Sequence, residues 1–396
     1  MENINNQIYL INKNIILSCG HKNCIIYNLD NNKITHCANK LANYLIEKEC
    51  EKIPASIIEV IGQDYTISEL EINTDRFESV KNVYLDLTDC CNFKCKNCFH
   101  KEVGEGQLVA DEVIEKINQL ENKSEIVITL MGGEPLLYKH DKLVTLLRKW
   151  SKEFKSINLF TNASLLDDEL IEVLKECGVL TRITFYSADE DVHNKYTGIK
   201  NSFNHNFKMI NKLRDNENKF KINLIFNKKD YNDYKNGKTI FNEITDSKYV
   251  DLVRPNNYSE LQLIKDREEV LDERYKPLNI RTIDTVNLFM KNHSCYASKM
   301  SIAINGDVYA CPWDRNKKIG NIVKDDYEEL KEKLVTNWER PIHEEYIMCK
   351  ECEFKILCFD CTYINKTIFK NSNIDYNSKP YFCTYNPISG GYEDGI

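Results

Sequence analysis

The sequence lacks three features that assign proteins to broad classes. It has no excess of positive charge, because 61 acidic and 53 basic residues give a formal net charge of −8, which offers no electrostatic support for binding nucleic acid. It has no apolar run long enough to span a bilayer. Its N-terminus, MENINNQIYLINKN, has no basic start followed by an apolar block and a small-residue cleavage site, so we expect no secretory signal. We therefore expect a cytoplasmic protein with neither a nucleic-acid nor a membrane partner.

Internal repeats and low-complexity segments are also missing from the 396 residues, which are enough for two or three domains. Cysteine, by contrast, is abundant, with 16 residues. A protein that is not exported is not expected to use them as a disulfide framework. They are clustered, with four in the stretch DCCNFKCKNC and seven between Cys295 and Cys383. Buried structural cysteines have no reason to cluster, so this distribution favours metal or redox chemistry over packing.

Between residues 81 and 260 the sequence alternates between strand and helix patterns. Short apolar runs rich in β-branched residues predict six buried strands, at residues 83–88, 126–131, 157–161, 182–187, 221–226 and 249–254. Amphipathic helical patterns lie between them, for example at residues 111–120 and 167–178. Six such units predict a parallel sheet with right-handed crossovers. Since a complete TIM barrel has eight units, we expect an open, partial (β/α)6 barrel of the α/β class.

Polar residues follow every one of these predicted strands. The carboxyl ends of barrel strands form the face that carries chemistry, so we expect the active site there, although any one of these residues alone is typical of an ordinary loop. In chain order they are the loop CNFKCKNC, the GGEP loop at residues 132–135, Thr161 and Asn162, Ser187 and Asp189, Asn227, and Arg254.

The first cysteine cluster has the spacing C-x3-C-x2-C, at Cys91, Cys95 and Cys98. Three thiolates provide three soft ligands, whereas a structural zinc site needs four and usually pairs one CxxC with another. A 4Fe–4S cluster held by three cysteines keeps one iron without a protein ligand. That iron is open to oxygen or nitrogen atoms of a substrate or cofactor.

This cysteine spacing after the first strand, with a GGEP loop after the second, resembles the radical S-adenosylmethionine (SAM) superfamily over residues 81–260. The resemblance implies that Cys91, Cys95 and Cys98 hold the cluster that cleaves SAM, whose amino and carboxylate groups chelate the fourth iron. The product is a 5′-deoxyadenosyl radical that abstracts hydrogen. The residues implied to contact SAM, or in the last case SAM or substrate, are Gly132, Gly133, Glu134, Asn162, Ser187 and Arg254.

The cysteine loop departs from the family pattern at one position. The family usually has an aromatic residue just before the third cysteine, where it contacts adenine, and this chain has Asn97, with Phe99 after Cys98. Cys90 lies outside the C-x3-C-x2-C spacing, and we interpret it as a residue that does not bind the cluster.

The second cysteine cluster resembles the SPASM extension of radical SAM peptide-modifying enzymes, which carries two auxiliary 4Fe–4S clusters. The stretch CKECEFKILCFDC has the spacing C-x2-C-x5-C-x2-C, where the family has three residues in the last interval. Four CxxC cysteines alone would favour a zinc ribbon. The resemblance implies that one cluster is held by Cys349, Cys352, Cys358 and Cys383, and the other by Cys295, Cys311 and Cys361. The second set leaves an iron that is open or held by another ligand, and an open iron suggests thioether formation from a substrate thiolate.

The chain therefore divides into four predicted segments. They are a small α+β, winged-helix-like module at residues 1–80, the barrel at 81–260, a charged connector at 261–290, and the SPASM segment at 291–396. The module reads as a hairpin around DNN followed by the helix NKLANYLIEKE. It serves either to bind a leader peptide along its hairpin edge or as a plain structural cap.

The resemblance implies an oxygen-sensitive maturase of ribosomally made peptides. Its expected partners are a precursor peptide with its leader, or a protein client, and an electron donor of the flavodoxin or ferredoxin type. Two alternatives stay open: oxidation of Ser or Cys in a protein client, as in sulfatase maturases, and a catalytically silent peptide-binding partner. A simple ferredoxin-like carrier is disfavoured, because it has no use for a six-unit barrel.

Overall fold

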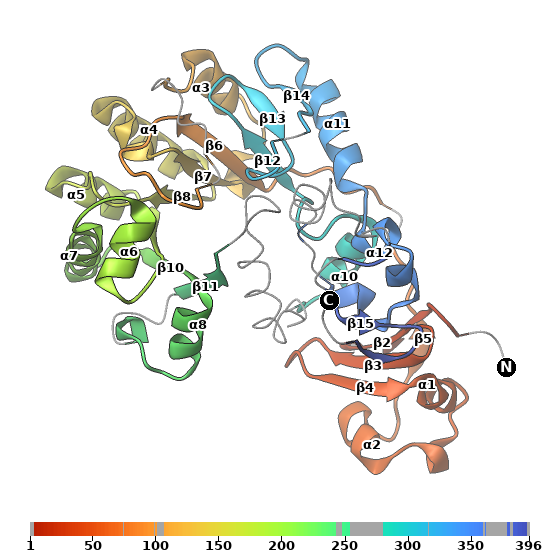
Figure 1. Ribbon diagram of the computed structural model, residues 1–396. Helices are drawn as coiled ribbons and strands as arrows, with labels where there is room; N and C mark the ends of the chain where they lie inside the picture. Colours follow the sequence, from red (N-terminus) through yellow and green to blue (C-terminus); the bar gives the residue numbers. More distant parts are fainter. Residues whose placement is uncertain are drawn as a thin grey trace. The chain divides into compact units, whose positions relative to one another are not determined.

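The computed structural model describes residues 4–73, 75–98, 100, 107–242, 248–253, 280–315, 317–358, 361, 378–380 and 383–393. The chain forms two compact units, shown in Figure 1. The first unit comprises residues 1–77, 271–297 and 335–396, and the second comprises residues 78–270 and 298–334. This division cuts across the four segments expected from sequence, whose limits stay a prediction.

The second unit contains the predicted barrel strands. They pair in parallel and in chain order, so the α/β partial barrel predicted from sequence is confirmed. The strands are β6 (Asn82–Thr88), β7 (Val127–Gly132), β8 (Ser156–Thr161), β9 (Leu180–Phe185), β10 (Phe220–Phe226) and β11 (Lys248–Leu252).

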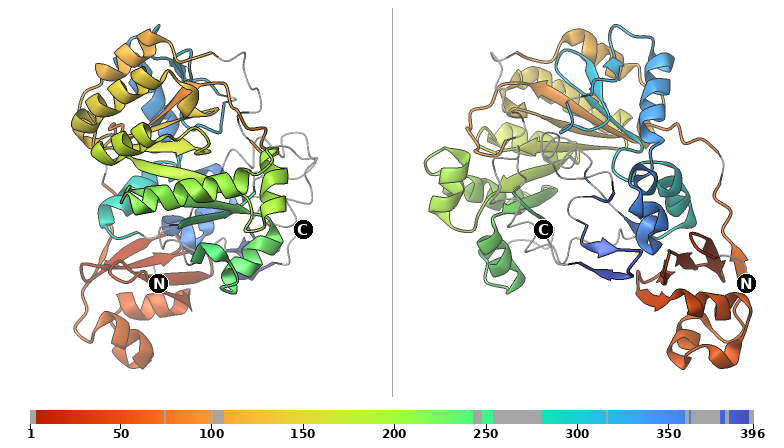
Figure 2. Two further views of the ribbon diagram at one scale, coloured as in Figure 1. Left: turned by 90° about the vertical axis from the view of Figure 1, so that its left-hand side faces the viewer. Right: turned by 45° about the vertical axis from the view of Figure 1, so that its right-hand side comes forward.

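Helices connect these strands and cover one face of the sheet, as Figures 1 and 2 show. The strand side chains that alternate toward the helices, such as Leu85 and Leu87, are fully buried, and so is Val113 on the first of the helices. The helices are α3 (Asp111–Asn118), α4 (His140–Glu153), α5 (Asp168–Glu176), α6 (Glu190–Thr197), α7 (Ser202–Asp215) and α8 (Lys228–Lys235), with short 3-10 turns at Lys123–Glu125, Pro135–Leu137 and Ile240–Asn242.

The barrel sheet continues beyond β6 into the SPASM segment. Strand β12 (Lys299–Ile302) pairs in parallel with β6, and β13 (Asp307–Tyr309) and β14 (Gly320–Asn321) follow in antiparallel order. The predicted hairpin turn is present, with Gly306 at φ +83°. The sequence did not predict that this hairpin extends the barrel sheet. Because β12 covers β6, the first barrel strand is not an open edge.

The first unit is built on a five-stranded antiparallel sheet in the order β4-β3-β2-β1-β5. The predicted DNN hairpin joins β3 to β4, and the predicted helix follows as α1. The elements are β1 (Ile8–Ile11), β2 (Ile15–Cys19), β3 (Asn23–Asn28), β4 (Ile34–Ala38), α1 (Asn39–Ile46), α2 (Ala55–Ile61) and β5 (Ile67–Glu69), with a 3-10 turn at Cys50–Lys52.

Later parts of the chain complete this unit. They are α10 (Ile283–Lys291), the end of α11 (Tyr327–Trp338), α12 (Ile342–Glu345), the 3-10 helices η6 (Met348–Glu351) and η7 (Glu353–Leu357), and the short strands β15 (Tyr385–Asn386) and β16 (Gly391–Tyr392).

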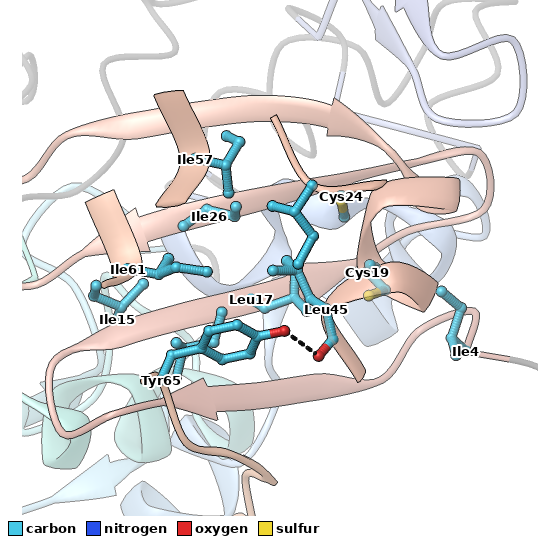
Figure 3. Packing of buried hydrophobic residues seen from close by; sticks show 13 residues of the cluster. Ile4, Ile15, Leu17, Cys19, Cys24, Ile26, Leu45, Ile57, Ile61 and Tyr65 are labelled. Carbon is cyan, nitrogen blue, oxygen red and sulfur yellow. Dashed lines mark hydrogen bonds between the residues drawn. The ribbon is translucent and has the colours of Figure 1, made fainter. Parts of the chain in front are cut away.

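Both faces of the N-terminal sheet are buried. Figure 3 shows one face, where Leu17 and Ile26 pack against Leu45 of α1 and Ile57 of α2. The opposite face packs against α10 and η7, through residues that include Ile8, Ile16, Ile25, Tyr27, Val286, Ile356 and Leu357. The N-terminal module therefore shares a hydrophobic core with the C-terminal segment and is not a free-standing domain.

None of the helices that the structure describes is long and apolar enough to cross a membrane.

Tyr27 connects the two parts of this core through a hydroxyl that donates to Ile280 O (2.8 Å) and accepts from Ile280 N (3.1 Å). We expect Tyr27→Phe to lower the free energy of unfolding by about 1–3 kcal/mol, because both buried backbone groups lose their partner. Urea denaturation measures the change. Tyr44→Phe on α1 is the matched control, since its ring lies against Lys40 and Lys52. An equal loss in the control would contradict this role of the Tyr27 hydroxyl.

Candidate metal and cofactor sites

The loop that carries Cys91, Cys95 and Cys98 follows β6 and is attached to the end of α6. Lys94 N donates to Thr197 O at 3.0 Å, and Lys96 N donates to Tyr196 O at 2.8 Å. A side chain at Gly198 would come within 3.1 Å of Lys94 O, so a small residue is needed at this contact. The loop is thus held in place by a helix that lies about a hundred residues later in the sequence.

The three thiols are half-buried and close enough to influence one another. Burial raises the pKa of the Cys91 thiol to about 11, and the nearby Cys98 thiol adds to that effect. Burial, followed by the charges of Cys98 and Cys91, raises the pKa of Cys95 to about 12. The Cys91 and Cys95 thiols therefore hold their protons at neutral pH unless a cation replaces them, and this behaviour fits metal-binding residues.

Two further features of these thiols suit a metal–sulfur site. Phe93 N lies 3.4 Å from Cys91 Sγ as a hydrogen-bond donor, and Tyr186 hydrogen-bonds the Cys95 thiol through its side chain. In iron–sulfur proteins, such bonds to the ligating sulfur set the reduction potential. The Tyr186 ring stacks on Tyr196, with centroids 5.5 Å apart. Tyr186 was missed from sequence, where its only signal was its position at the end of a barrel strand.

The fold itself requires glycine at the first two positions of the GGEP loop. An added side chain at Gly132 would collide with Thr88 O, and one at Gly133 would collide with Cys90 O. The close approach brings two hydrogen bonds, Gly133 N to Thr88 O (2.8 Å) and Glu134 N to Cys90 O (2.7 Å). The end of β7 thereby fixes the start of the cysteine loop. That these glycines also line the methionine of SAM stays a prediction.

Glu134 is fully buried and joins the ends of β7 and β8. Its carboxylate accepts hydrogen bonds from Thr161 Oγ1 (2.6 Å), Asn162 N (2.7 Å) and Leu136 N (3.1 Å). Burial raises the pKa of Glu134 to about 7, against the opposing effect of these three donors. Because three donors of the chain already occupy the carboxylate, its contact with the ammonium group of SAM stays a prediction.

Asn162 and Ser187 both lie at the carboxyl ends of their strands. Asn162 Nδ2 is 3.9 Å from Cys91 Sγ and donates to Asn92 Oδ1 at 2.8 Å, so this predicted residue lies next to the cysteine loop. Ser187 is buried and its hydroxyl donates to Asp230 Oδ1 at 2.9 Å. Arg254 and Phe99 lie outside the described residues.

Two other polar residues that follow barrel strands act as helix caps. Asp189 Oδ1 accepts from Val192 N (3.0 Å) at the start of α6, and Asn227 Oδ1 accepts from Asp230 N (2.9 Å) at the start of α8. Strand-to-helix connections need such caps, so their polarity alone does not indicate a site.

The second site is a cavity in the first unit. The four cysteines that the resemblance assigned to one auxiliary cluster, Cys349, Cys352, Cys358 and Cys383, all line it. Burial raises the pKa of Cys352 far above its usual range, so this thiol also requires a cation to ionise. Four cysteines lining one cavity match the ligand number of a 4Fe–4S cluster, and they also match the zinc ribbon considered from sequence.

The N-terminal module contributes to the surroundings of this cavity, which the sequence did not predict. Glu353 is fully buried; its carboxylate lies 2.6 Å from His36 Nε2 of β4 and accepts a short hydrogen bond from the Tyr385 hydroxyl. Lys355 Nζ donates to Asn6 O at 3.0 Å, and burial lowers the pKa of this ammonium. Charged groups near the cavity are therefore bonded to the N-terminal module through Glu353 Oε1 and Lys355 Nζ, whereas Glu353 Oε2 has no hydrogen-bond partner among the described residues.

The third predicted set, Cys295, Cys311 and Cys361, stays a prediction. Cys295 and Cys361 belong to the first unit and Cys311 to the second, and all three are half-buried. Trp313 N donates to Cys311 Sγ at 3.4 Å, as Phe93 N does to Cys91. Among the described residues, no three or more His, Cys, Asp or Glu side chains are grouped so that they could hold a metal ion.

Comparison with known proteins identifies two regions. Residues 85–233 match the radical SAM superfamily, and residues 295–353 match the SPASM iron–sulfur cluster-binding domain. The first match contains the C-x3-C-x2-C loop and the GGEP loop. The second contains Cys295, Cys311, Cys349 and Cys352.

Among relatives, the chain is 24% identical over 313 residues to the antilisterial bacteriocin subtilosin biosynthesis protein AlbA of Bacillus subtilis, covering 73% of this chain and 68% of AlbA. Two solved structures share the fold. Streptococcus suis SuiB bound to its precursor peptide SuiA has a TM-score of 0.53 at 15% identity, over 95% of this chain and 100% of SuiB. The protein anSMEcpe with bound AdoMet has a TM-score of 0.55 at 18% identity, over 75% of this chain and 90% of that protein.

Removing one cavity cysteine should remove one cluster. We expect Cys352→Ser to lower the iron and sulfide bound after anaerobic reconstitution by one cluster per chain, because its thiolate is one of the four predicted ligands. Iron and sulfide analysis measures the change. Cys177→Ser, in the residue that ends α5, is the control and should bind as much iron as the parent protein. Zinc in place of iron in the parent protein would show that the cavity is a zinc ribbon.

The buried His193 should make the fold sensitive to acid. Its Nδ1 accepts from Tyr186 N at 3.3 Å, and burial lowers its pKa to about 4. Between pH 6.5 and 4 the unfolded chain binds a proton here that the folded chain does not. The free energy of unfolding therefore falls by about 3 kcal/mol over this window as the pH drops. In urea titrations His193→Gln should remove that part of the slope, whereas exposed His21→Gln should keep it. Parallel slopes for parent and His193→Gln would contradict this assignment.

Proposed function

We propose that this chain, which carries a radical SAM domain and a SPASM iron–sulfur domain, is an enzyme that modifies side chains of a ribosomally made precursor peptide. The observation that carries the proposal is the three-cysteine loop at the carboxyl end of β6, fixed by the GGEP turn, in a chain that also has a cavity lined by four cysteines. AlbA, which is named for bacteriocin biosynthesis, and SuiB, solved with its precursor peptide, support a peptide substrate.

In this proposal Cys91, Cys95 and Cys98 hold a 4Fe–4S cluster. When bound, this cluster supplies an electron to SAM, whose cleavage yields a 5′-deoxyadenosyl radical that takes a hydrogen atom from the substrate. The chain's own contribution is to keep the loop in one conformation and to tune the sulfur atoms. The amide of Phe93 does so at Cys91, and the Tyr186 side chain does so at Cys95.

The residues proposed to contact SAM are those implied by the resemblance. Asn162 is the best supported, because its side-chain amide lies beside Cys91. Gly132, Gly133 and Glu134 form the turn that packs on the cysteine loop, so they lie where a ligand of the cluster would arrive. Ser187 and Arg254 are proposed from their positions after the fourth and sixth barrel strands.

The proposed number of clusters is three. Cys349, Cys352, Cys358 and Cys383 would hold one auxiliary cluster in the first-unit cavity, and Cys295, Cys311 and Cys361 would contribute to the other. The two auxiliary clusters would accept an electron from the substrate, bind it, or do both. A flavodoxin or ferredoxin would supply the electron that starts each turnover.

The N-terminal module is proposed to bind the leader segment of the precursor. Strand β4 is the last strand at one side of the sheet, and within the described residues it pairs with β3 alone. Its outer edge therefore offers main-chain groups to which a peptide can add as a further strand. The two alternatives, oxidation of a protein client and a silent binding partner, have no observation of their own in their favour.

SAM cleavage tests the proposal directly. After anaerobic reconstitution with iron and sulfide, and with SAM and dithionite, we expect the parent enzyme to form 5′-deoxyadenosine, measured by liquid chromatography. Cys95→Ala should abolish the product, because the cluster loses a ligand. Cys90→Ala is the matched control, since this neighbour lies outside the cluster spacing, and it should retain cleavage. A parent enzyme that forms no 5′-deoxyadenosine, or a Cys95→Ala variant that still does, would overturn the proposal.

A further inference from the structure

The barrel sheet has a polar face on the side away from its helices. Successive side chains along a strand point to opposite faces of the sheet. The residues next to those that pack on the helices therefore point to this polar face. Asp86 of β6, Arg182 of β9 and Asn223 of β10 belong to it, and the first and last of these are buried. A polar inner face is costly to fold, because polar groups taken from water need partners.

Arg182 is half-buried at the middle of this face. Its guanidinium lies over the Phe160 ring, 4.7 Å from the centroid, and donates to Asn223 Oδ1 at 3.3 Å through Nη2. Its Nε is buried and has no hydrogen-bond partner within the described residues. Burial lowers the pKa of the guanidinium, and the groups that counteract this are the Tyr84 and Tyr249 hydroxyls rather than a carboxylate.

A second cation lies beside Arg182. Lys221 of β10 is its partner in the strand register, and residues paired in this way project to the same face. Among the ion pairs formed by described residues, none includes Arg182 or Lys221. A guanidinium on a half-buried face loses hydration, and it gains no compensation from a cation at the paired position, so this arrangement is unfavourable unless an anion binds there.

The other arginine associated with this face has a partner. Arg315, which follows Cys311, donates to Asp86 Oδ2 at 2.8 Å, and its guanidinium lies 4.9 Å from the centroid of the Tyr309 ring. Both arginines therefore stack on an aromatic ring, but only Arg315 has a carboxylate among the described residues. Each guanidinium keeps one buried donor without a partner among the described residues, Nη1 of Arg315 and Nε of Arg182, so the two arginines differ in the carboxylate that Arg315 has and Arg182 lacks.

We propose that Arg182, with Lys221 beside it, binds a carboxylate of the peptide substrate. A guanidinium presents parallel N–H donors that match the two oxygens of a carboxylate, and stacking on Phe160 fixes its orientation. The carboxylate is either the side chain of Asp or Glu or the C-terminus of the peptide. This inference rests on the proposed function, because it takes the occupant of the inner face to be a peptide.

The position of Arg182 separates this site from the proposed SAM contacts. Tyr186, which hydrogen-bonds Cys95, is four residues farther along the same strand direction. At roughly 3.3 Å per residue, Arg182 lies about 13 Å below the level of the cysteine loop. An anion bound at Arg182 would therefore not contact the proposed cluster. It could hold one group of the substrate while another part of the substrate reacts near the cluster.

Binding of short peptides to the reconstituted, SAM-loaded enzyme tests the site. The probes are acetyl-Gly-Glu-Gly-amide, its Gln counterpart, and acetyl-Gly-Gln-Gly with a free C-terminus, titrated by calorimetry. SAM is kept saturating so that the peptides do not occupy its site. We expect one carboxylate peptide to bind roughly tenfold to a hundredfold more tightly than the neutral peptide, as a charge-assisted pair requires. Whether the Glu peptide or the free C-terminus is preferred identifies the source of the carboxylate.

Variants separate the site from general electrostatics. Arg182→Gln should remove the preference for the carboxylate peptide, and Arg182→Lys should keep part of it, because the charge remains while the fork is lost. Arg148→Gln is the matched control, since this arginine pairs with Glu176 on the exposed side of the helices. Equal binding of all three peptides to the parent enzyme would overturn the proposal. So would an Arg182→Gln variant that folds and still prefers the carboxylate.

Failure of this site and failure of the proposed function are distinguishable. Calorimetry requires no turnover, whereas the proposed function is tested by 5′-deoxyadenosine formation. Cleavage of SAM without a carboxylate preference would overturn the site and keep the enzyme. A carboxylate preference without SAM cleavage would overturn the reaction and keep the site.

Discussion

The close contact between the turn after β7 and the loop after β6 is the constraint on which the rest of the second unit depends. Gly132 and Gly133 have no side chains because the carbonyl oxygens of Thr88 and Cys90 occupy that space. The backbone bonds made there fix where the cysteine loop begins, and the buried carboxylate of Glu134 extends the connection to β8. The GGEP turn resembles a ligand-binding motif, but the packing of the fold already requires its two glycines. Because the turn lies beside the thiols, a ligand bound there could also contact it.

The first unit follows a different principle. Its cysteine cavity is surrounded by short elements, namely the one-turn helix α12, the 3-10 helices η6 and η7, and two short strands. Stability comes from the N-terminal sheet, which packs its second face on η7 and provides His36 and the Asn6 carbonyl to charged residues near the cavity. The module that the sequence suggested as a peptide reader therefore also supports the cysteine-rich segment. Binding along β4 would act on a strand that directly contacts Glu353.

Much of the barrel could be predicted from sequence because its information is local. Runs such as IVITLM and KINLIF identify buried parallel strands, and the turn residues around Asn31 and Gly306 identify hairpins. Cysteine spacing likewise led to the four thiols of the cavity. The features that sequence missed all depend on pairing between distant segments: β12 on β6, the N-terminal sheet on η7, and Tyr186 beside Cys95. No residue pattern near either partner reports such a pairing. Arg182 was missed for a related reason, since an arginine within a strand is unusual only once its neighbours are known.

The shared core of the first unit has a consequence for biosynthesis. Tyr27 and Ile25 emerge from the ribosome more than three hundred residues before Ile356 and Leu357, which cover them. Until then one apolar side of the nascent sheet is uncovered, which is a hazard for aggregation during translation. The cavity cysteines appear at the same late stage. Closure of the N-terminal sheet and assembly of its cysteine-rich cover are therefore expected to occur together, well after the sheet itself has been synthesised.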